Sequence, residues 1–326
     1  MNGINVAIVG ATGLVGQTFL KVLEERNFPI KELYCFASSR SAGKTIEFKG
    51  KTYVVEELTE QSFDREIDIA LFSAGGGISK KFAPIAASKG VRVVDNSSAW
   101  RMEAEIPLIV PEVNPHVLSH NDYIISNPNC STIQSVVPLK VLHEAFGIKR
   151  IVYSTYQAVS GSGVKGLHDL EAGTTEFYPY PIVGNCLPHI DVFLDNGYTK
   201  EEVKMIEETK KILGDQNIKV TATTVRVPVK YGHSVSMNLE FEREFELEED
   251  YRLLQSVDGL VVHGHENSLD YPMPIDVEGH NEVHVGRIRR DFSVDSGLNL
   301  WVVADNIRKG AATNTVQIAE LLLDYL

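Results

Sequence analysis

The first sixteen residues hold the feature that most limits what this chain can fold into. An apolar run, Ile4 to Val9, leads into three evenly spaced glycines, Gly10, Gly13 and Gly16, and apolar residues at helical spacing extend from Leu14 to Glu25. A strand, a tight glycine turn and a helix in this order predict the first unit of a parallel sheet covered by helices.

Glycines in such a turn let the backbone approach a pyrophosphate at the start of a helix. The spacing here, G-x-x-G-x-x-G, differs from the commoner G-x-G-x-x-G. The position between a strand and a helix nevertheless favours a dinucleotide site over a plain turn. We predict cofactor contacts from Gly10, Thr12, Gly13, Leu14, Val15 and Gly16.

The residues after the second predicted strand, Leu33 to Ala37, indicate which dinucleotide binds. NAD sites usually place an acidic residue there, which binds the ribose 2′-hydroxyl. This chain has Ser38, Ser39, Arg40 and Ser41 instead. A cation and hydroxyl groups suit a 2′-phosphate, so we predict NADP as the cofactor.

A run of glycines also follows the predicted strand Ile67 to Phe72. Glycines at the carboxyl end of a strand let the backbone come close to a ligand in the crevice where open α/β sheets bind. A flexible loop would explain the run nearly as well. We include Ala74, Gly75 and Gly76 in the predicted cofactor site.

The pattern changes after about residue 130. Before it, short apolar runs such as Val91 to Val94 alternate with helical stretches such as Ser79 to Ser88. After it come long alternating segments, which favour a mostly antiparallel sheet. They are residues 151–157, 218–229, 283–292 and 298–304, with helices expected at 164–177, 199–213 and 307–323.

The predicted fold is therefore α/β, with an N-terminal Rossmann-type parallel-sheet domain and an α+β domain with a mostly antiparallel sheet. The last helix can pack back against the first domain, which makes the domains discontinuous. We expect an NADP-binding domain at 1–127 plus 305–326, and a catalytic and dimerisation domain at 128–304.

Composition excludes some partners. The 31 Lys and Arg against 44 Asp and Glu give a net charge of −13, which argues against nucleic-acid binding but not against a small anion. Three cysteines without a C-x-x-C pair form no disulfide framework and favour a reducing compartment. The sequence has no membrane-length apolar run and does not open like a signal peptide. We expect a cytoplasmic protein without a membrane partner.

Cys130 is the strongest candidate nucleophile. Pro128 and the flanking Asn127 and Asn129 end a predicted strand, and a helix is expected from Ser131 onward. The free N–H groups and dipole at a helix start favour a thiolate. A buried structural cysteine is the commoner role of an isolated cysteine, but the polar neighbours weigh against it here. Cys35 and Cys186 are interpreted as structural.

A base for this thiol is expected at His233. It follows Gly232 at the turn between two long alternating strands, seven residues after Arg226. A single loop histidine is usually a surface residue, but a histidine at a strand end can face a cleft. Its unperturbed pKa near 6.5 suits proton transfer.

These motifs together resemble the bacterial-type aspartate-semialdehyde dehydrogenase family along essentially the whole chain. The matching segments are GATGLVG, SSRSAGK, FSAGGGISK, DNSSAWRM, NPNCSTI, YQAVSGSG, EEVK, RVPVKYGHS and DNIRKGAATNTVQIAE. Each is short, but their order and spacing are specific. The resemblance implies NADPH-dependent reduction of L-aspartyl 4-phosphate to L-aspartate 4-semialdehyde and phosphate, in lysine, threonine and methionine biosynthesis, by a homodimer.

The resemblance also implies roles for particular residues. Cys130 is the nucleophile, His233 the acid/base and Gln157 the residue that orients the thioester or the attacking group. Arg226 binds the substrate α-carboxylate and Glu201 its α-amino group. The phosphate is bound by Arg101, Lys204 and Asn129, and Gly161 joins the cofactor site.

Other functions remain open at this stage. N-acetyl-γ-glutamyl-phosphate reductase and glyceraldehyde-3-phosphate dehydrogenase use the same combination of cysteine, histidine and nicotinamide. The former usually has Gly before its cysteine and the latter a Ser-Cys-Thr-Thr run, whereas this chain has Asn-Cys-Ser-Thr. A non-catalytic NADP-binding protein is a further alternative, against which Cys130, Gln157, Arg226 and His233 argue together.

A metal-dependent hydrolase is the alternative from another class. Its ligands would come from His263, His265, Asp270, Asp276, His280 and His284. Two histidines in an H-x-H pattern on a strand can present both rings on one face. Because the intervening segment is typical of an irregular loop, we predict no metal among the site residues, and the sequence leaves open what role the cluster from His263 to His284 has.

Overall fold

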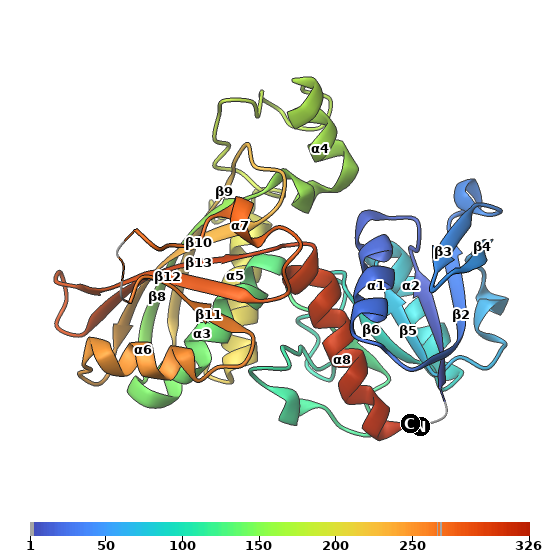
Figure 1. Cartoon of the computed structure of the whole chain (residues 1–326), viewed down its shortest axis with the longest axis horizontal. Coiled ribbons are helices and arrows are strands. Elements are labelled where there is room, and N and C mark those ends of the chain that lie inside the picture. Colours follow the sequence, from blue (N-terminus) through green and yellow to red (C-terminus); the bar gives the residue numbers. More distant parts are fainter. Residues whose placement is uncertain (1–2, 266, 268) are drawn as a thin grey trace. The chain divides into compact units, whose positions relative to one another are not determined.

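A seven-stranded sheet organises the first of two compact units, which comprises Met1–Pro128 and Ala311–Leu326 (Figure 1). The structure, a computed structural model, describes residues 3–265, 267 and 269–326. Asn129–Gly310 form the second unit. Residues 305–310, which the sequence analysis assigned to the first domain, therefore belong to unit 2.

The elements of unit 1 alternate as predicted. They are β1 (Ile4–Val9), α1 (Leu14–Glu25), β2 (Ile30–Ala37), β3 (Thr45–Phe48), β4 (Lys51–Glu57), β5 (Ile69–Phe72), α2 (Gly76–Ser88), β6 (Arg92–Asp95), β7 (Ile124–Ser126) and α8 (Asn314–Leu322). The strand order is β3-β4-β2-β1-β5-β6-β7, and every pair except β3–β4 is parallel. The predicted Rossmann-type sheet is confirmed, whereas the β3–β4 hairpin was missed.

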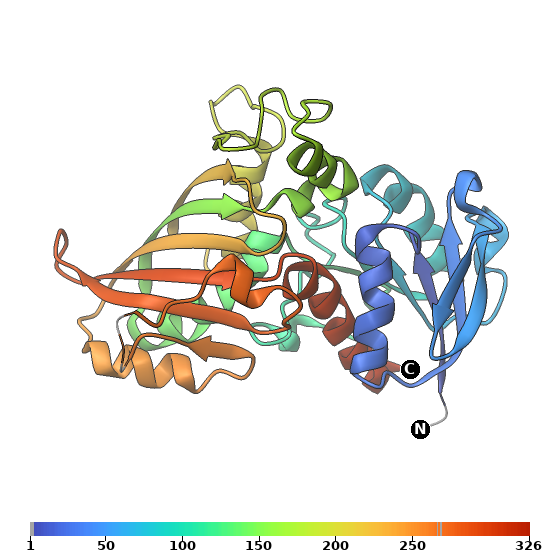
Figure 2. The same ribbon diagram turned by 45° about the horizontal axis from the view of Figure 1, so that its top comes forward.

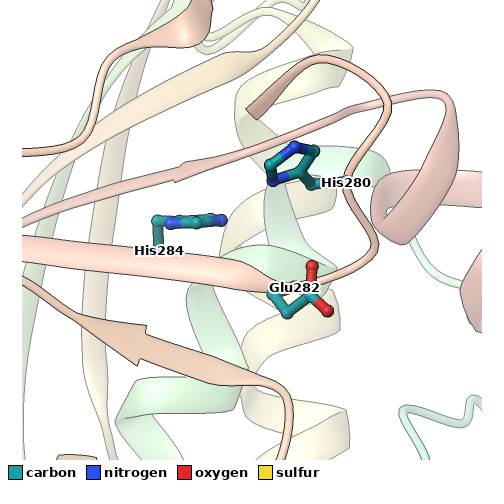
Figure 3. A group of neighbouring side chains, drawn as sticks. All are labelled: His280, Glu282 and His284. Carbon is teal, nitrogen blue, oxygen red and sulfur yellow. The ribbon is translucent and has the colours of Figure 1, made fainter. Parts of the chain in front are cut away.

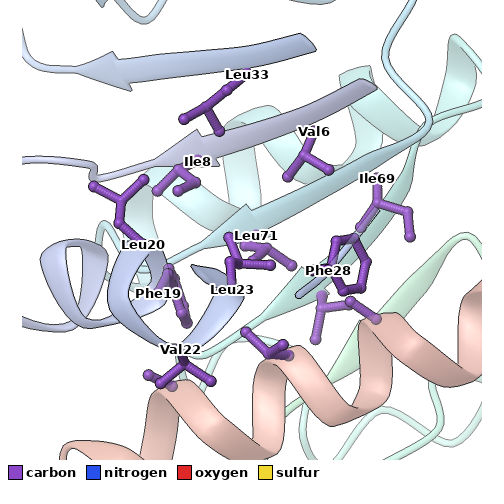
Figure 4. Close-up of a cluster of buried hydrophobic side chains, with 14 of the residues drawn as sticks. Val6, Ile8, Phe19, Leu20, Val22, Leu23, Phe28, Leu33, Ile69 and Leu71 are labelled. Atoms are coloured by element: carbon purple, nitrogen blue, oxygen red, sulfur yellow. The ribbon is translucent and has the colours of Figure 1, made fainter. Parts of the chain in front are cut away.

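The core of unit 1 explains why the end of the chain belongs to it. Figure 4 shows Val6 and Ile8 of β1 with Phe19 and Val22 of α1, and α8 packed against this cluster. Val316 and other α8 residues are fully buried in the same cluster. Burying an aliphatic side chain stabilises the fold by roughly 1.5–3 kcal/mol. The expected last helix is shorter than predicted, because residues 308–313 form a π-helical turn before α8.

Unit 2 contains a six-stranded sheet in the order β11-β12-β13-β10-β8-β9. Its elements are α3 (Cys130–Phe146), β8 (Ile148–Gln157), α4 (Gly163–Ala172), α5 (Lys200–Leu213), β9 (Lys219–Arg226), β10 (His233–Phe241), α6 (Leu247–Gln255), β11 (Leu260–Val262), α7 (Pro274–Val277), β12 (Val283–Asp291) and β13 (Gly297–Ala304). The three central pairs are antiparallel and the two outer pairs, β8–β9 and β11–β12, are parallel. The predicted mostly antiparallel sheet is confirmed.

One face of this sheet is covered by helices α3, α5 and α6 (Figure 2). On β10 the buried residues Val235, Met237 and Leu239 alternate with half-buried Ser236 and Asn238, as a strand with one covered face requires. The helix predicted at 164–177 was wrong in length: α4 ends at Ala172 because Gly173 adopts a left-handed conformation with φ of 68°.

Candidate active site

A cavity of about 430 Å³ lies at the carboxyl ends of β1, β2 and β5 in unit 1. Among the residues predicted to bind a dinucleotide, the cavity is lined by Gly10, Thr12, Gly13, Ser38, Ser39 and Ala74. The remaining predicted cofactor-binding residues of unit 1 lie next to these in sequence but do not line the cavity. They are Leu14, Val15 and Gly16 in the first turn of α1, Arg40 and Ser41 after Ser39, and Gly75 and Gly76 at the start of α2.

Two glycines of the first turn are required by close backbone contacts. Gly10 has φ of 91°, and a Cβ there would lie 2.2 Å from the carbonyl oxygen of Ser73. A Cβ on Gly16 would lie 2.2 Å from the carbonyl oxygen of Gly10. No L side chain fits such distances, so the strand can turn into α1 at this radius only with glycine at both positions. The cavity depends on that turn.

The polar edge of the cavity lies at the end of β2. Ser38 and Ser39 line it, and the hydroxyl of Thr12 donates a hydrogen bond of 3.4 Å to Ser41. Glu57, the last residue of β4, also lines it and pairs in register with Ala37. Glu57 was not predicted from the sequence, because β4 was not predicted either.

Cys130 is the first residue of α3, and its side chain is half-buried. The side-chain oxygen of Asn129 caps this helix by accepting hydrogen bonds from the N–H groups of Ser131 (3.0 Å) and Thr132 (3.2 Å). The cap explains why the helix begins here and holds the sulfur at the positive end of its dipole.

Asn129 connects this helix to a buried polar cluster. Its side-chain N–H group donates to Glu201 (2.8 Å), which also accepts from Gln157 (3.4 Å) and from Lys204 (3.1 Å). Burial opposes ionisation of Glu201, but the charge of Lys204 and the hydrogen bond from Asn129 outweigh it and lower the pKa of this carboxyl group. Lys204 also donates to Asp191 (2.7 Å). Four predicted site residues are thus in one network.

His233 and Arg226 form a second group around the backbone of one residue, Ala158. The N–H of Ala158 donates to Nδ1 of His233 (2.9 Å), and the carbonyl of Ala158 accepts from Arg226 (2.6 Å). A Cβ on Gly161 would lie 3.0 Å from the Arg226 guanidinium and 3.3 Å from the His233 ring. Gln157, which precedes Ala158, pairs in register with Arg226 across β8 and β9.

The hydrogen bond at Nδ1 fixes the tautomer of His233. Because Nδ1 accepts, the neutral ring carries its proton on Nε2. That atom is buried and has no hydrogen-bond partner within the described part of the chain. Burial, helped by the charge of Arg226, holds the pKa of His233 well below its usual range. The ring is therefore neutral near pH 7 and presents a donor.

The two groups are connected through α3. Gln134, one turn after Cys130, donates to the backbone carbonyl of His233 (2.9 Å). On the other side, a Cβ on Gly310 would lie 3.0 Å from the Cβ of Cys130. The thiol, an imidazole, a guanidinium and a carboxylate with its lysine therefore belong to one packed region of unit 2.

Arg101 belongs to unit 1 and is buried there. Its guanidinium donates to the backbone carbonyls of Asn127 (2.9 Å) and Asn96 (3.0 Å). The contacts fix its position after β6. Its predicted phosphate role stays a prediction.

Two acidic residues of the site were missed from the sequence. Glu208 is buried and accepts a 2.6 Å hydrogen bond from the backbone N–H of Asn129, and Asp191 pairs with Lys204. Glu208 lies two turns of α5 after Glu201, so the helix faces both carboxylates toward Asn129. That spacing was visible in the sequence, but nothing local linked it to the start of α3.

The histidines proposed for a hydrolase separate into two places. His265 lies after β11, not on a strand, and contacts Glu248 (3.0 Å). His263 instead lies 3.0 Å from His284, and His280 is near the same ring. The H-x-H arrangement on one strand face is therefore wrong, because β11 ends at Val262.

Comparison with known proteins gives two domain matches. Residues 5–121 match the family model described as semialdehyde dehydrogenase, NAD binding domain, and residues 139–309 match semialdehyde dehydrogenase, dimerisation domain. Together they cover most of the chain. Within the described residues no helix is both long and apolar enough to cross a membrane.

Individual relatives match over nearly the full length. An aspartate-semialdehyde dehydrogenase of Aquifex aeolicus is 56% identical over 334 residues, covering 98% of each chain. The crystal structure of aspartate semialdehyde dehydrogenase II from Vibrio cholerae complexed with ASA has a TM-score of 0.95, with 49% identity and 99% coverage of each chain. The Candida albicans enzyme with NADP has a TM-score of 0.80, with 28% identity and 99% coverage of each chain.

Proposed function

The chain belongs to the aspartate-semialdehyde dehydrogenase family, and from this premise we propose that it converts L-aspartyl 4-phosphate to L-aspartate 4-semialdehyde and phosphate through a thioester on Cys130. It is an NADP-dependent oxidoreductase of amino-acid biosynthesis, in the route to lysine, threonine and methionine. The other phosphorylating dehydrogenases, the metal-dependent hydrolase and the non-catalytic alternative are disfavoured by this family membership.

One observation carries the proposal. Cys130 begins α3, and the same Asn129 that caps this helix holds Glu201, which in turn contacts Gln157 and Lys204. A thiol at the positive end of a helix is a nucleophile, and the neighbouring charges suit a zwitterionic acyl phosphate. The nucleophile and the proposed ammonium-binding carboxylate are therefore held by the same amide side chain.

The steps follow from these groups. The Cys130 thiolate attacks the acyl carbon, a C–S bond forms, and the C–O bond to phosphate breaks with the electron pair leaving on phosphate. NADPH, when bound, supplies a hydride for the thioester carbon. The resulting oxyanion then re-forms its carbonyl, the C–S bond breaks, and Cys130 leaves as a thiolate.

His233 fits this sequence as a hydrogen-bond donor. Its Nε2–H, fixed by the Ala158 hydrogen bond at Nδ1, can donate to the oxygen that becomes negative after hydride addition. Proton abstraction from the thiol would require the other tautomer and the loss of that bond. We therefore place His233 chiefly as a donor to the oxyanion, a narrower role than the acid/base expected from the resemblance.

Three cations and one carboxylate are proposed to bind the substrate. Arg226 uses one guanidinium nitrogen on Ala158, while its buried Nε has no partner among the described residues and suits a carboxylate. Glu201 is proposed to bind the ammonium group. Lys204 and Arg101 are proposed to bind phosphate with Asn129, in which case phosphate replaces Asp191 as the partner of Lys204.

The cavity of unit 1 fits NADP. Its glycine turn leaves room for a pyrophosphate, and Ser38, Ser39 and the nearby Arg40 suit a 2′-phosphate. Gly161, in unit 2 beside His233, is proposed to approach the nicotinamide end. We propose unit 1 as the NADP-binding domain and unit 2 as the catalytic and dimerisation domain of a cytoplasmic homodimer.

The test compares two cysteines. NADP reduction is followed with aspartate semialdehyde and phosphate for wild type, Cys130→Ala and Cys186→Ala, the last an exposed loop cysteine. We expect Cys130→Ala to lose activity by at least ~1,000-fold with NADP binding retained, and Cys186→Ala to match wild type. Retained activity in Cys130→Ala, or turnover only with the N-acetylglutamyl analogue, would overturn the proposal.

A further inference from the structure

Three alternating residues lie together at the start of β12, away in sequence from every residue assigned above. His280 and Glu282 lie in the loop before the strand, and His284 is the second residue of β12. The fold of this loop, and not strand alternation, brings the three side chains together. Their ligand atoms all lie within 4.8 Å of one another, and Figure 3 shows the His284 ring pointing toward the space between the other two.

The ring of His284 has an unused ligand atom. His284 is 8% exposed, and its Nε2 is buried without a hydrogen-bond partner within the described ranges. A buried polar atom without a partner costs free energy, and native structures rarely leave one without a reason. Because this atom belongs to the cluster of His280 and Glu282, a bound cation would supply the missing partner.

A chain of hydrogen bonds determines which tautomer His284 adopts, and hence whether its Nε2 carries a proton or a lone pair. Asp270 lies 2.8 Å from Nδ1 of His263, and Nε2 of His263 lies 3.0 Å from Nδ1 of His284. The carboxylate can only accept, so His263 donates to it and accepts from His284. His284 then carries its proton on Nδ1, which leaves the lone pair of Nε2 directed into the cluster.

The geometry points to a binding site for a divalent transition metal, Zn²⁺ above all, formed by His280, Glu282 and His284 with Asp270 and His263 behind it. Two imidazoles and a carboxylate are ligands that Zn²⁺ takes, with water as the fourth. A hydrogen-bond acceptor behind a ligating histidine, which fixes its tautomer, is a common second layer of such sites. Here that acceptor for His284 is His263, which Asp270 holds in turn. We assign the site a structural role and not a part in the acyl transfer.

Only small movements are needed to close the site. Tetrahedral Zn²⁺ with bonds of 2.0–2.1 Å requires ligand atoms about 3.4 Å apart. His284 is fixed on β12, whereas His280 and Glu282 are exposed and can rotate inward. The backbone that leads into the cluster is held, because the N–H of Gly279 donates to Asp305 (2.9 Å) and that of His280 donates to Val277 (3.0 Å). One carboxylate oxygen of Glu282 accepts from the N–H of Asn281 (3.1 Å), so its other oxygen is the one proposed to bind the metal.

The test measures metal binding to the full-length chain. After chelator treatment, Zn²⁺ affinity is determined by competition with a colorimetric chelator, and Co²⁺ is added as a spectroscopic probe. We expect one Zn²⁺ per chain and a Co²⁺ spectrum without thiolate charge transfer. His280→Ala, an exposed change that leaves the strand intact, is expected to raise Kd at least 100-fold, and Asp270→Asn roughly 10- to 100-fold.

Controls separate this site from other ligands. His265→Ala removes a nearby histidine outside the cluster and is expected to keep wild-type affinity. Cys130→Ala is expected to keep it too, because the thiol is not a ligand in this assignment. The proposal is overturned if Zn²⁺ binding disappears with Cys130→Ala, or if His280→Ala and wild type bind equally. Far-UV circular dichroism of each metal-free variant confirms its fold.

Discussion

Glu201 and Glu202 are adjacent on α5 and both buried, at 5% and 8% exposed, yet their contacts differ. Glu201 accepts from three side chains of the site, Asn129, Gln157 and Lys204. Glu202 accepts from the backbone N–H groups of Thr199 (2.7 Å) and Thr224 (3.1 Å) and completes the cap of α5. Replacing each with glutamine separates a binding role from a structural one.

The expected magnitudes follow from the number of acceptors lost. Glutamine keeps one acceptor oxygen and adds a donor, so each change leaves one buried donor facing an N–H group. The cost is about 1–3 kcal/mol of unfolding free energy in both variants. If Glu201 binds the substrate ammonium, Glu201→Gln also loses one charge-assisted contact of about 1.5–3 kcal/mol, which is a roughly 10- to 150-fold rise in KM for aspartate semialdehyde. Glu202→Gln leaves that contact intact.

Steady-state kinetics and thermal unfolding at equal protein concentration measure both effects. We expect both variants to melt at lower temperature, with only Glu201→Gln raising KM for the semialdehyde and neither changing KM for NADP. Equal KM changes in the two variants, or an unchanged KM in Glu201→Gln, would refute the assignment of Glu201. NADP serves as the internal control because Glu201 and Glu202 lie in unit 2, outside the unit 1 cavity.

Three further predictions concern stability and close contacts. Burial raises the pKa of Asp250 to about 7, so this carboxyl group keeps a proton in the folded chain that the unfolded chain releases near pH 4. The contribution of Asp250 to stability is therefore most favourable below pH 4 and is lost as the pH rises to about 7. Asp250→Asn should raise unfolding free energy on the order of 2–3 kcal/mol at pH 8 and little at pH 4.5, as denaturant titrations can show. Gly16→Ala places a Cβ 2.2 Å from the Gly10 carbonyl oxygen and should weaken NADPH binding at least ~10-fold in fluorescence titration. Gly310→Ala places one 3.0 Å from the Cβ of Cys130 and should lower kcat about 10-fold with little change in KM, as measured by steady-state turnover.

Local signals explain what the sequence predicted well in unit 1. The apolar run and the glycine turn fix β1 and α1 because both depend on neighbouring residues only. The β3–β4 hairpin was missed because β4 is largely polar and exposed, and because β3, although Ile46 and Phe48 alternate with polar residues, is only four residues long. The one sequence feature that indicates this turn is Gly50. In the structure Lys49 and Gly50 both have positive φ, 48° and 71°, as a two-residue hairpin turn requires.

The site was predictable where a motif is contiguous and not where contacts are distant. Cys130 at a helix start could be inferred from its neighbours. Glu208 could not, because its contact with the backbone of Asn129 joins positions 79 residues apart. The tautomer of His233 likewise depends on Ala158, 75 residues earlier. Residue types suggest which chemistry is possible, whereas only packing determines which atom of each residue is available.

Asn129 shows why these distant contacts matter for the chemistry. Its oxygen fixes the start of α3 and hence the thiol, while its N–H group fixes Glu201. One amide thus links the nucleophile to the proposed ammonium site, so a displacement of either the start of α3 or Glu201 would displace the other. Asp at this position would keep the cap but place a second carboxylate against Glu201, and Ala would lose both contacts. Only an amide supplies an acceptor for the helix and a donor for the carboxylate at once, which makes Asn129 a positioning residue as well as a proposed phosphate ligand.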